Sequence, residues 1–410
     1  MTDALAITIG GLGAQGDGLA LTTDRECHIP GALPGEKVRR QADGGFSIVG
    51  PPSPDRRATP LCSHVPRCGG CTVQHMGDTL YRDWKSALLA AALSQRGLAC
   101  PISPMRSMAR RSRRRASFTG VWVDGRPALG FRGRDTHDLE PIADCAVLRT
   151  PIVAALPQLA QLAAVVVPKG KPFRLAVLAA DNGLDIAIDQ RLAPAADRAM
   201  ATVAQLMRAA GAIRLTCNNR LVLQMAEPIV LIADVAVSPG PGAFLQATSE
   251  TDALLADLVI EGLGKARHVL DLFCGVGTLS WALARRARVT AVDADASLLA
   301  TLEKARNGAR GLKPIQPVRR DLFRDPLSPR ELEKADAIVL DPPRAGATAQ
   351  CQSIARSKVR RVVMVSCNPA TLGRDLRLLV DGGYRLETAA PIDQFLFTHH
   401  LEVVAVLSRD

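Results

Sequence analysis

The last 170 residues of the chain alternate short apolar runs with helical patterns. Runs with strand character cover 269–273, 289–292, 337–340 and 362–366, and helical patterns cover 277–287, 296–309, 348–358 and 370–380. A β-α-β-α order of this kind folds into a sheet of parallel strands with helices on both faces. We therefore predict a doubly wound parallel α/β sheet from residue 240 onward, with any ligand at the carboxyl ends of its strands.

The first 240 residues have a different pattern. Residues 1–50 contain short β-like runs separated by glycines and two Pro-Gly pairs, which predicts a small β-barrel. Residues 11–16 match Gly-x-Gly-x-x-Gly, but a strand-like run follows where a dinucleotide site needs a helix, so we interpret them as a hairpin loop. A proline-rich linker at 51–60, strands over 102–150 and a hairpin at 173–189 are expected next. An amphipathic helix is expected at 78–95, with an apolar face formed by Leu80, Trp84, Leu88, Leu89 and Ala92.

Composition narrows the class of protein. The chain has 51 Lys+Arg against 40 Asp+Glu, a formal charge of +11, which favours a polyanionic partner such as nucleic acid. Aromatic residues make up only 3%, so arginine would carry most of the binding. With 47% hydrophobic residues, disorder is excluded. The start lacks a basic region before an apolar run, and no long uncharged apolar stretch follows. We therefore expect a cytoplasmic protein without a membrane span.

A glycine-containing loop follows the first strand of the predicted sheet. Residues 271–278 read Asp-Leu-Phe-Cys-Gly-Val-Gly-Thr, and Asp293 ends the next strand, where it can accept hydrogen bonds from ribose hydroxyls. Gly275 lets the backbone approach a ligand closely. The third glycine of a pyrophosphate loop is missing, which favours S-adenosylmethionine over a nicotinamide cofactor, although the loop alone leaves the latter open.

Two further strand ends indicate the chemistry. Asp341-Pro-Pro-Arg344 stands at the fourth strand, where nucleic-acid methyltransferases carry such a loop, but amine methyltransferases have an aromatic residue in the place of Arg344. Cys367 ends the next strand beside a helix N-terminus, which predicts a thiolate with a pKa below the free value of about 8.5. The alternative is a buried structural cysteine.

A cysteine nucleophile suits a carbon target. C5 of uracil attacks a methyl sulfonium only after a thiolate has added to C6, and the C5 proton must then be removed by a base. Glu402, at the head of an apolar last strand, is the candidate base. His400, two residues earlier on the same strand face, is a candidate to orient Glu402 or to contact the substrate.

A group of cysteines predicts a metal site. Cys62, Cys68 and Cys71 lie within ten residues, and Cys145 can supply a fourth thiolate. Four thiolates suit tetrahedral zinc or a [4Fe–4S] cluster, and the spacing does not separate them. In a zinc site, His64 or His75 could replace Cys145.

Arginines are concentrated in one segment of the central region. They are Arg106, Arg110, Arg111, Arg113, Arg114 and Arg115, followed by the run Gly130-Phe131-Arg132-Gly133-Arg134. Such a run is often only a solvated face, but beside a methyltransferase it predicts a phosphate track. Arg113 and Arg114 are the expected phosphate contacts, and Phe131 and Arg132 are expected to stack on unpaired bases.

Together these blocks resemble the tRNA and rRNA uracil-5-methyltransferases. Phe244-Leu245-Gln246, 271–277, 341–344, Ser366-Cys367-Asn368-Pro369 and His400-Leu401-Glu402 stand in the order of that family. The resemblance implies that Cys367 is the nucleophile and Glu402 the base. The donor site it implies consists of Gln246, Phe273, Asp293, Asp321 and Asp341, with Gly275 and Thr278 in the same loop. The chain departs from the family at Thr248 and Thr278, where members carry asparagine.

The resemblance also implies an architecture and partners. The expected fold is α/β, with a Rossmann-like class I methyltransferase domain at 240–410, an N-terminal OB-like (TRAM) β-barrel at 1–50 and a central α+β iron–sulfur domain at 51–239. It favours [4Fe–4S] over zinc, and a monomer acting on a loop of 23S rRNA or tRNA. An exocyclic-amine methyltransferase and a non-catalytic iron–sulfur protein that binds or folds RNA remain the alternatives.

Overall fold

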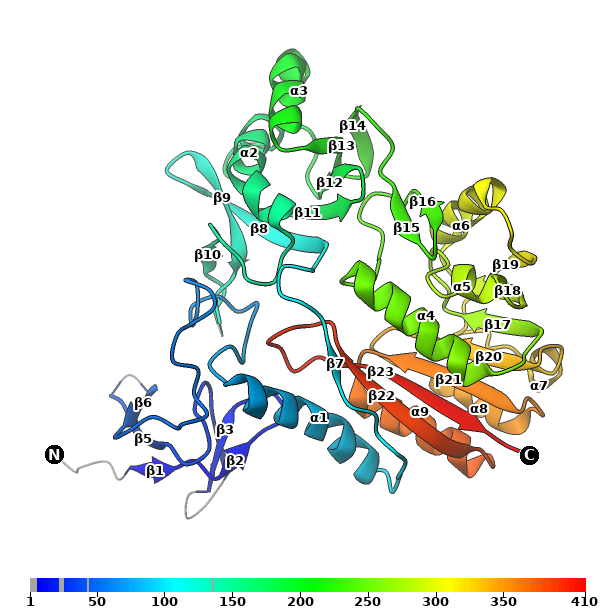
Figure 1. Cartoon of the computed structure of the whole chain (residues 1–410). Helices are drawn as coiled ribbons and strands as arrows, with labels where there is room; N and C mark the ends of the chain where they lie inside the picture. The colour runs from blue at the N-terminus through cyan, green and yellow to red at the C-terminus, as the bar shows by residue number, and fades with distance from the viewer. Residues whose placement is uncertain (1–5, 22–25, 43, 135) are drawn as a thin grey trace.

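The computed structural model describes residues 6–21, 26–42, 44–134 and 136–410. Figure 1 shows three regions: small N-terminal sheets, a central sheet with two helices, and a large C-terminal sheet covered by helices on both faces. The start of the chain at residues 1–5, part of the expected barrel, lies outside the described residues. None of the helices within the described ranges is both long and apolar enough to cross a membrane.

The large sheet has eight strands in the order β19-β18-β17-β20-β21-β23-β22-β7. Their bounds are β7 Arg106–Ser107, β17 His268–Leu272, β18 Arg288–Asp293, β19 Ile315–Arg319, β20 Ala337–Leu340, β21 Arg361–Ser366, β22 Arg385–Asp393 and β23 Glu402–Ser408. Strands β17 to β21 are parallel, and β23 runs antiparallel to both β21 and β22. The predicted parallel sheet is therefore confirmed for β17, β18, β20 and β21. Strand β19 was not expected from the sequence, and β23 departs from the prediction because it runs antiparallel to its neighbours. A short loop without a crossover helix joins β22 to β23, which forces an antiparallel pair.

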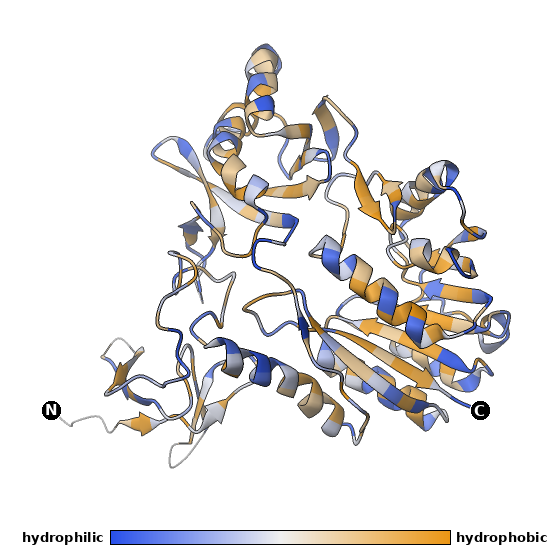
Figure 2. Cartoon of the chain, viewed as in Figure 1, coloured by the Kyte–Doolittle hydropathy of each residue, from blue (hydrophilic) through white to orange (hydrophobic). Residues whose placement is uncertain are grey.

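Successive residues of these strands bury opposite faces. In β17, Val269 packs into one core and Leu270 into the other. The first face is covered by α4 (Ser249–Leu263), α5 (Ser280–Ala284) and α6 (Ala296–Gly308), and the second by α1 (Asp78–Ser94), α7 (Pro329–Leu332), α8 (Thr348–Arg356) and α9 (Pro369–Asp381). Figure 2 shows the resulting apolar strands between amphipathic helices. This arrangement places the carboxyl ends of the parallel strands at one edge.

Helix α1 and strand β7 come from the predicted central domain but pack on the large sheet. Leu89 and Leu93 of α1 belong to the second core, and Gly373 of α9 lies so close that a Cβ there would be 2.8 Å from the carbonyl oxygen of Ala92. The predicted apolar face consisted of Leu80, Trp84, Leu88, Leu89 and Ala92, but the buried residues are Tyr81, Trp84, Lys85, Leu89 and Leu93. The difference arises because buried Lys85 pairs with Asp393 of β22, a contact that apolar periodicity does not encode.

The central region is a seven-stranded sheet in the order β10-β9-β8-β11-β12-β13-β14. Its strands are β8 Arg115–Val123, β9 Arg126–Arg132, β10 Leu139–Pro141, β11 Phe173–Ala180, β12 Gly183–Ile188, β13 Ala212–Cys217 and β14 Arg220–Gln224. The expected hairpin over 173–189 is confirmed as the antiparallel pair β11–β12. Helices α2 (Thr150–Val166) and α3 (Met200–Ala209) pack on this sheet. A hairpin of β15 (Val230–Ile232) and β16 (Val235–Val237) leads into the large sheet region.

The N-terminal region forms two three-stranded antiparallel sheets, β1-β5-β6 and β2-β3-β4. Their strands are β1 Ile7–Thr8, β2 Gly11–Leu12, β3 Gly18–Leu21, β4 Glu26–Ile29, β5 Lys37–Arg40 and β6 Phe46–Val49. Both sheets contribute to one small core that contains Ala20, Ile29 and Val38. The run at 11–16 lies in the β2–β3 hairpin, which confirms the rejection of a dinucleotide loop. A closed barrel stays a prediction.

Candidate functional site

A cavity of about 770 Å³ lies at the carboxyl ends of the parallel strands. It is lined by all nine residues assigned to catalysis or to the methyl donor: Gln246, Phe273, Gly275, Thr278, Asp293, Asp321, Asp341, Cys367 and Glu402. The cysteine-rich loop reaches the same cavity through Gly69, Gly70 and Thr72. Residues from three separate parts of the chain therefore form one site.

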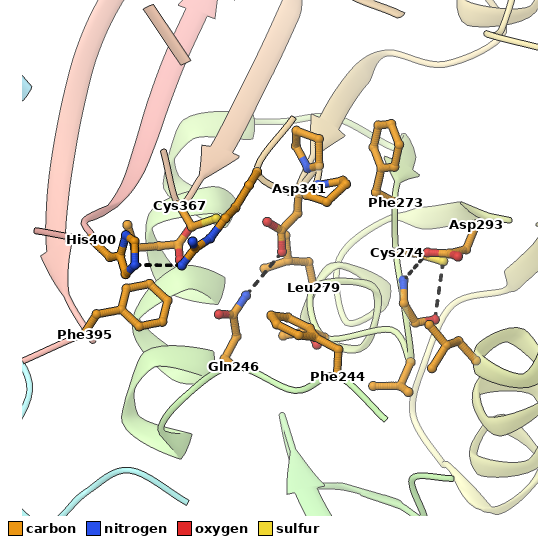
Figure 3. Close-up of a pocket in the computed structure, with 18 of the residues that line it drawn as sticks. Phe244, Gln246, Phe273, Cys274, Leu279, Asp293, Asp341, Cys367, Phe395 and His400 are labelled. Atoms are coloured by element: carbon orange, nitrogen blue, oxygen red, sulfur yellow. Dashed lines mark hydrogen bonds between the residues drawn. The ribbon is translucent and has the colours of Figure 1, made fainter. Parts of the chain in front are cut away.

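The loop after β17 forms one end of the cavity, on the right of Figure 3. Phe273 and Gly275 both have positive φ, +64° and +56°, so this turn uses a conformation that favours glycine. The N–H of Gly275 donates to one carboxylate oxygen of Asp293 at 2.9 Å, and the N–H of Asp295 donates to the other at 2.9 Å. Asp293 is thus held at the end of β18 with lone pairs left to accept further hydrogen bonds.

Carboxylates make this part of the cavity acidic. Asp271 is buried under the loop and accepts a hydrogen bond from Oγ of Ser280 at 2.5 Å. Burial, with Asp341 and Asp293 nearby, raises the pKa of Asp271 to about 7. Burial likewise raises the pKa of Asp341 to about 7. Buried carboxyl groups that repel one another are stabilised by a cationic ligand, so these residues fit a sulfonium compound.

Cys367 and Glu402 lie at the other end. Cys367 directly follows β21, and Glu402 is the first residue of β23, only 2% exposed. Burial raises the pKa of the Cys367 thiol to about 11, helped by the charges of Glu402 and Asp341. The prediction of a lowered thiol pKa was therefore wrong, because burial and two carboxylates outweigh the helix N-terminus. Burial and Asp341 also raise the pKa of Glu402.

His400 does not lie on β23 as expected, but in the loop that precedes this strand. Figure 3 shows it on the same side of the cavity as Cys367, and its Nε2 is hydrogen-bonded to Nη2 of Arg344 at 2.9 Å. Because β23 begins at Glu402 and His400 lies before it, the two do not share a strand face. Burial, His399 and Arg344 lower the pKa of His400 to about 4. His400 therefore partners Arg344 rather than Glu402.

Of the four cysteines of the predicted cluster, Cys145 packs in one hydrophobic cluster with Cys68 and in another with Cys71. Besides burial, the charge of Cys145 raises the pKa of Cys68 and Cys71, and the charge of Cys62 raises that of all three others. Among the described residues, however, no group of three or more His, Cys, Asp or Glu side chains is arranged to hold a metal ion. The metal site therefore stays a prediction.

The two histidines considered as ligands for that site, His64 and His75, have different surroundings. Nδ1 of His64 bonds Glu140 at 2.9 Å, and Nε2 accepts from the N–H of Ala143 at 3.1 Å, so both ring nitrogens are occupied. Burial lowers the pKa of His75 to about 4.

The cysteine loop is attached to the loop that precedes β23, because the N–H groups of Thr72 and Val73 donate to the carbonyl of Phe397 at 2.9 and 3.1 Å.

One predicted RNA contact is wrong. Arg114 is 1% exposed, pairs with Asp252 at 2.7 Å and donates from Nε to the carbonyl of Gln246 at 3.1 Å. It is a structural link between the central region and the segment of Gln246 and Asp252, because its side chain faces inward beside the start of β8. Arg113 lines the cavity, and Arg132 is exposed at the end of β9. Phe131 is half-buried against Phe118, with ring centroids 5.1 Å apart.

Several residues in or beside the cavity were missed by sequence reasoning. They are Arg320, Leu322, Phe323, Gln394, Phe395, Thr398 and His399. Arg115 and Phe244, both named from the sequence, also line the cavity, and the guanidinium of Arg115 lies 4.4 Å from the ring centroid of Phe244. The loop at 394–401, rich in aromatic and polar residues between two apolar strands, was the signal that could have identified four of them.

Comparison with known proteins agrees with this geometry. The family model described as tRNA (uracil-5-)-methyltransferase matches residues 323–410, and that of the methyltransferase small domain matches residues 237–362. A structure of Pyrococcus abyssi tRNA (uracil-54, C5)-methyltransferase with S-adenosyl-L-homocysteine superposes with a TM-score of 0.76 at 21% identity, covering 98% of this chain and 99% of that one. It supports the fold.

Full-length relatives are more similar in sequence to this chain than the Pyrococcus abyssi enzyme is. An RNA methyltransferase of Brucella suis is 41% identical over 406 residues, with 98% of this chain and 97% of the relative covered. The 23S rRNA (uracil(1939)-C(5))-methyltransferase RlmD of Chromohalobacter salexigens is 33% identical, with 92% of this chain and 84% of the relative covered. With the site geometry described above, these matches show that the chain belongs to the RNA uracil-5-methyltransferase family.

Proposed function

We propose that this protein transfers a methyl group from S-adenosylmethionine to C5 of a uridine in RNA, through a covalent bond between Cys367 and C6 of the base. The observation that carries the proposal is one cavity in which a thiol, a buried carboxylate and an acidic strand-end loop meet. The thiol and the carboxylate, Cys367 and Glu402, interact electrostatically. The acidic loop fits the donor.

The donor would occupy the end formed by the loop after β17. Bound there, S-adenosylmethionine supplies an electrophilic methyl group on a positively charged sulfur. Asp293 would accept hydrogen bonds from the ribose, and Asp341 would attract the positive sulfur. A Cβ added at Gly275 would meet no heavy atom within 4 Å, so the backbone there is open to a ligand. Phe273 and Phe323, with ring centroids 5.4 Å apart, provide an apolar wall.

Cys367 would start the reaction at the other end. Its thiolate adds to C6 of uracil, and the electrons of the C5=C6 bond move toward O4 to give an enolate. C5 then forms a bond to the methyl group, and the bond between that carbon and the donor sulfur breaks. Arg344, which lowers the pKa of Cys367, favours the thiolate.

Glu402 would complete the reaction as the general base. It takes the proton from the methylated C5, the electron pair re-forms the C5=C6 bond, and the bond from C6 to the sulfur of Cys367 breaks. The target uridine has to leave its base stack to reach this depth, which costs least in an unpaired loop. Both a 23S rRNA enzyme and a tRNA enzyme are among the similar proteins, so we propose RNA loops of both kinds as candidate substrates.

We also propose that Cys62, Cys68, Cys71 and Cys145 hold a [4Fe–4S] cluster. Cys145 packs in one hydrophobic cluster with Cys68 and in another with Cys71, which supports a ligand that these thiols share, and four thiolates are the usual ligands of such a cluster. The cluster would stabilise the loop that reaches the cavity and would take no part in methyl transfer. Monomeric state and cytoplasmic location stay predictions.

The reaction is tested with RNA that carries tritium at C5 of uridine. The wild type should release tritium into water in step with methyl transfer from labelled donor. Cys367→Ala should do neither. Methyl transfer without tritium release would point to an exocyclic amine instead, and RNA binding without methylation of any RNA would point to a non-catalytic role.

A further inference from the structure

The side chain of Gln394 lies between the proposed base and the donor site. It directly follows β22 and is 1% exposed. Its Nε2 donates to Oε2 of Glu402 at 2.5 Å and to Oε1 of Gln246 at 2.8 Å. Its Oε1 accepts from the backbone N–H of Ala247 at 2.9 Å. The amide therefore has a partner on each side.

The orientation of this amide is fixed by chemistry. A backbone N–H can only donate, so the carbonyl oxygen of Gln394 has to face Ala247, and both N–H bonds then point toward acceptors. Gln246 extends this series of hydrogen bonds, because its Nε2 donates to Oδ2 of Asp341 at 3.3 Å, as Figure 3 shows. Two amides thus connect the carboxylate of Glu402 with that of Asp341.

Neighbouring residues hold this series of hydrogen-bonded side chains in place. Arg114, ion-paired with Asp252, donates from its backbone N–H to the carbonyl of Ala247 at 2.9 Å and from its side chain to that of Gln246. On the other side, Asp393 accepts a hydrogen bond from the hydroxyl of Tyr81 at 2.6 Å and pairs with buried Lys85. Gln394 therefore has little freedom to turn away from Glu402.

The charges around Glu402 explain why this contact matters. Burial and the charge of Asp341 favour the protonated form of Glu402, and the hydrogen bond from Gln394 opposes both. Cys367 is the other titratable group whose charge interacts with Glu402. Arg344, His399 and His400 line the same end of the cavity, and the Lys85–Asp393 pair lies behind Gln394. Glu402 can accept a proton only when its carboxylate is ionised.

We propose that Gln394 is a positioning residue for proton removal from C5, which aims the carboxylate of Glu402 at the substrate and keeps it ionised. The inference rests on the proposed function and concerns only the second half of the reaction, in which the C5 proton is removed and the adduct is released. The proton leaves C5 for Glu402, the C5=C6 bond re-forms, and the bond to Cys367 breaks. Formation of the covalent adduct does not use Glu402 as a base, so loss of Gln394 should slow release of the adduct and leave its formation intact.

The test compares the full-length wild type with Gln394→Met and Gln394→Glu on C5-tritiated uridine RNA that the wild type methylates. Met removes both donors. Glu keeps the size of the side chain and, when protonated, one donor and the acceptor, so it preserves the fold. We expect tritium release to slow about 10- to 100-fold, as for loss of a hydrogen bond to a charged group. The acid limb of the pH profile of tritium release should move about one to two pH units higher. The covalent adduct should accumulate.

Gln350 provides the matched control. It is also a 1% exposed amide, and its partners are the backbone N–H and carbonyl of Leu327. Gln350→Met should lower the melting temperature, but it should neither move the pH profile of tritium release nor trap the covalent adduct. Unshifted profiles and no adduct in both Gln394 variants, beside an active wild type, would overturn the inference alone. A wild type that releases no tritium from any RNA would overturn the proposed function and the inference with it.

Discussion

Nη2 of Arg344 donates a hydrogen bond to Nε2 of His400 at 2.9 Å, which joins the loop after β20 to the loop before β23. Because a guanidinium is always charged and can only donate, Nε2 of His400 is the acceptor and the ring is neutral. The low pKa of His400, about 4, agrees with this. The pair places a permanent positive charge at the end of the cavity where Cys367 lies.

Removing this charge should make Cys367 less reactive. Arg344 lowers the pKa of the thiol, so Arg344→Ala should raise it and reduce alkylation of Cys367 by iodoacetamide about 3- to 10-fold at pH 8.5. Mass spectrometry of the peptide that contains Cys367 separates it from the other cysteines. Arg344→Lys keeps the charge and should react nearly as the wild type. Equal alkylation of the Ala variant and the wild type would contradict the role of Arg344.

The charge of the methyl donor should activate the same thiol. The pKa of Cys367, about 11, is raised by burial and by the carboxylates Glu402 and Asp341. A cationic sulfonium beside Asp341 offsets that effect and lowers the thiol pKa, whereas the neutral thioether of S-adenosylhomocysteine does not. Alkylation of Cys367 at pH 8.5 should therefore be faster with saturating S-adenosylmethionine than with saturating S-adenosylhomocysteine.

Asp341→Asn gives the matching comparison without ligand. Loss of one negative charge lowers the pKa of Cys367, so this variant should be alkylated faster than the wild type at pH 8.5 although it binds the donor more weakly. The curve of alkylation rate against pH should move to lower pH. A curve that does not move would show that Asp341 has no influence on the thiol.

Two arginines of the same segment should behave in opposite ways. Arg114 is buried with Asp252, so Arg114→Met should cost about 3–5 kcal/mol of unfolding free energy by leaving a buried carboxylate without its partner. Arg132 is exposed, so Arg132→Ala should leave the melting temperature unchanged and weaken the binding of RNA with unpaired bases, on which its guanidinium is expected to stack. Chemical denaturation and binding at several salt concentrations measure the two effects. A stable Arg114→Met variant with a reduced salt slope would restore Arg114 as an RNA contact.

The cluster is tested by its content. Anaerobically purified protein should contain about four iron and four acid-labile sulfide per chain, as expected for [4Fe–4S]. Cys145→Ser should lose most of both. Cys27→Ser, a half-buried thiol of β4, should keep them. One zinc per chain and no sulfide would contradict the cluster.

The C-terminal half of the fold could be predicted from sequence because strands buried on both faces give uninterrupted apolar runs. Ala337–Leu340 was predicted to the residue. Asp293 and Cys367 could be proposed as site residues from their places at the ends of such strands, whereas Gln246, Phe273 and Asp321 were proposed only from the resemblance to the family. The hairpin of β22 and β23 could not be predicted in the same way, because strand direction depends on the length of the connection and not on the run itself.

Contacts between distant charged groups account for most of what was missed. Arg114 looked like a member of a basic surface, and only its partner Asp252, more than 130 residues later, shows that it is buried. The thiol pKa of Cys367 was misjudged because burial, together with two carboxylates remote in sequence, outweighs the local helix N-terminus. Gln394 carries no motif at all, and its importance follows from the three groups that it contacts.

The most direct test of the covalent mechanism is the mass of the protein after reaction of Glu402→Gln with substrate RNA and S-adenosylmethionine. Glutamine cannot accept the C5 proton, so the methylated uridine should stay bonded to the enzyme. After nuclease and protease digestion, the account predicts a methylated nucleotide attached to the peptide with Cys367, and none in the double variant with Cys367→Ala. Full turnover by Glu402→Gln, or a nucleotide attached to a different residue, would contradict it.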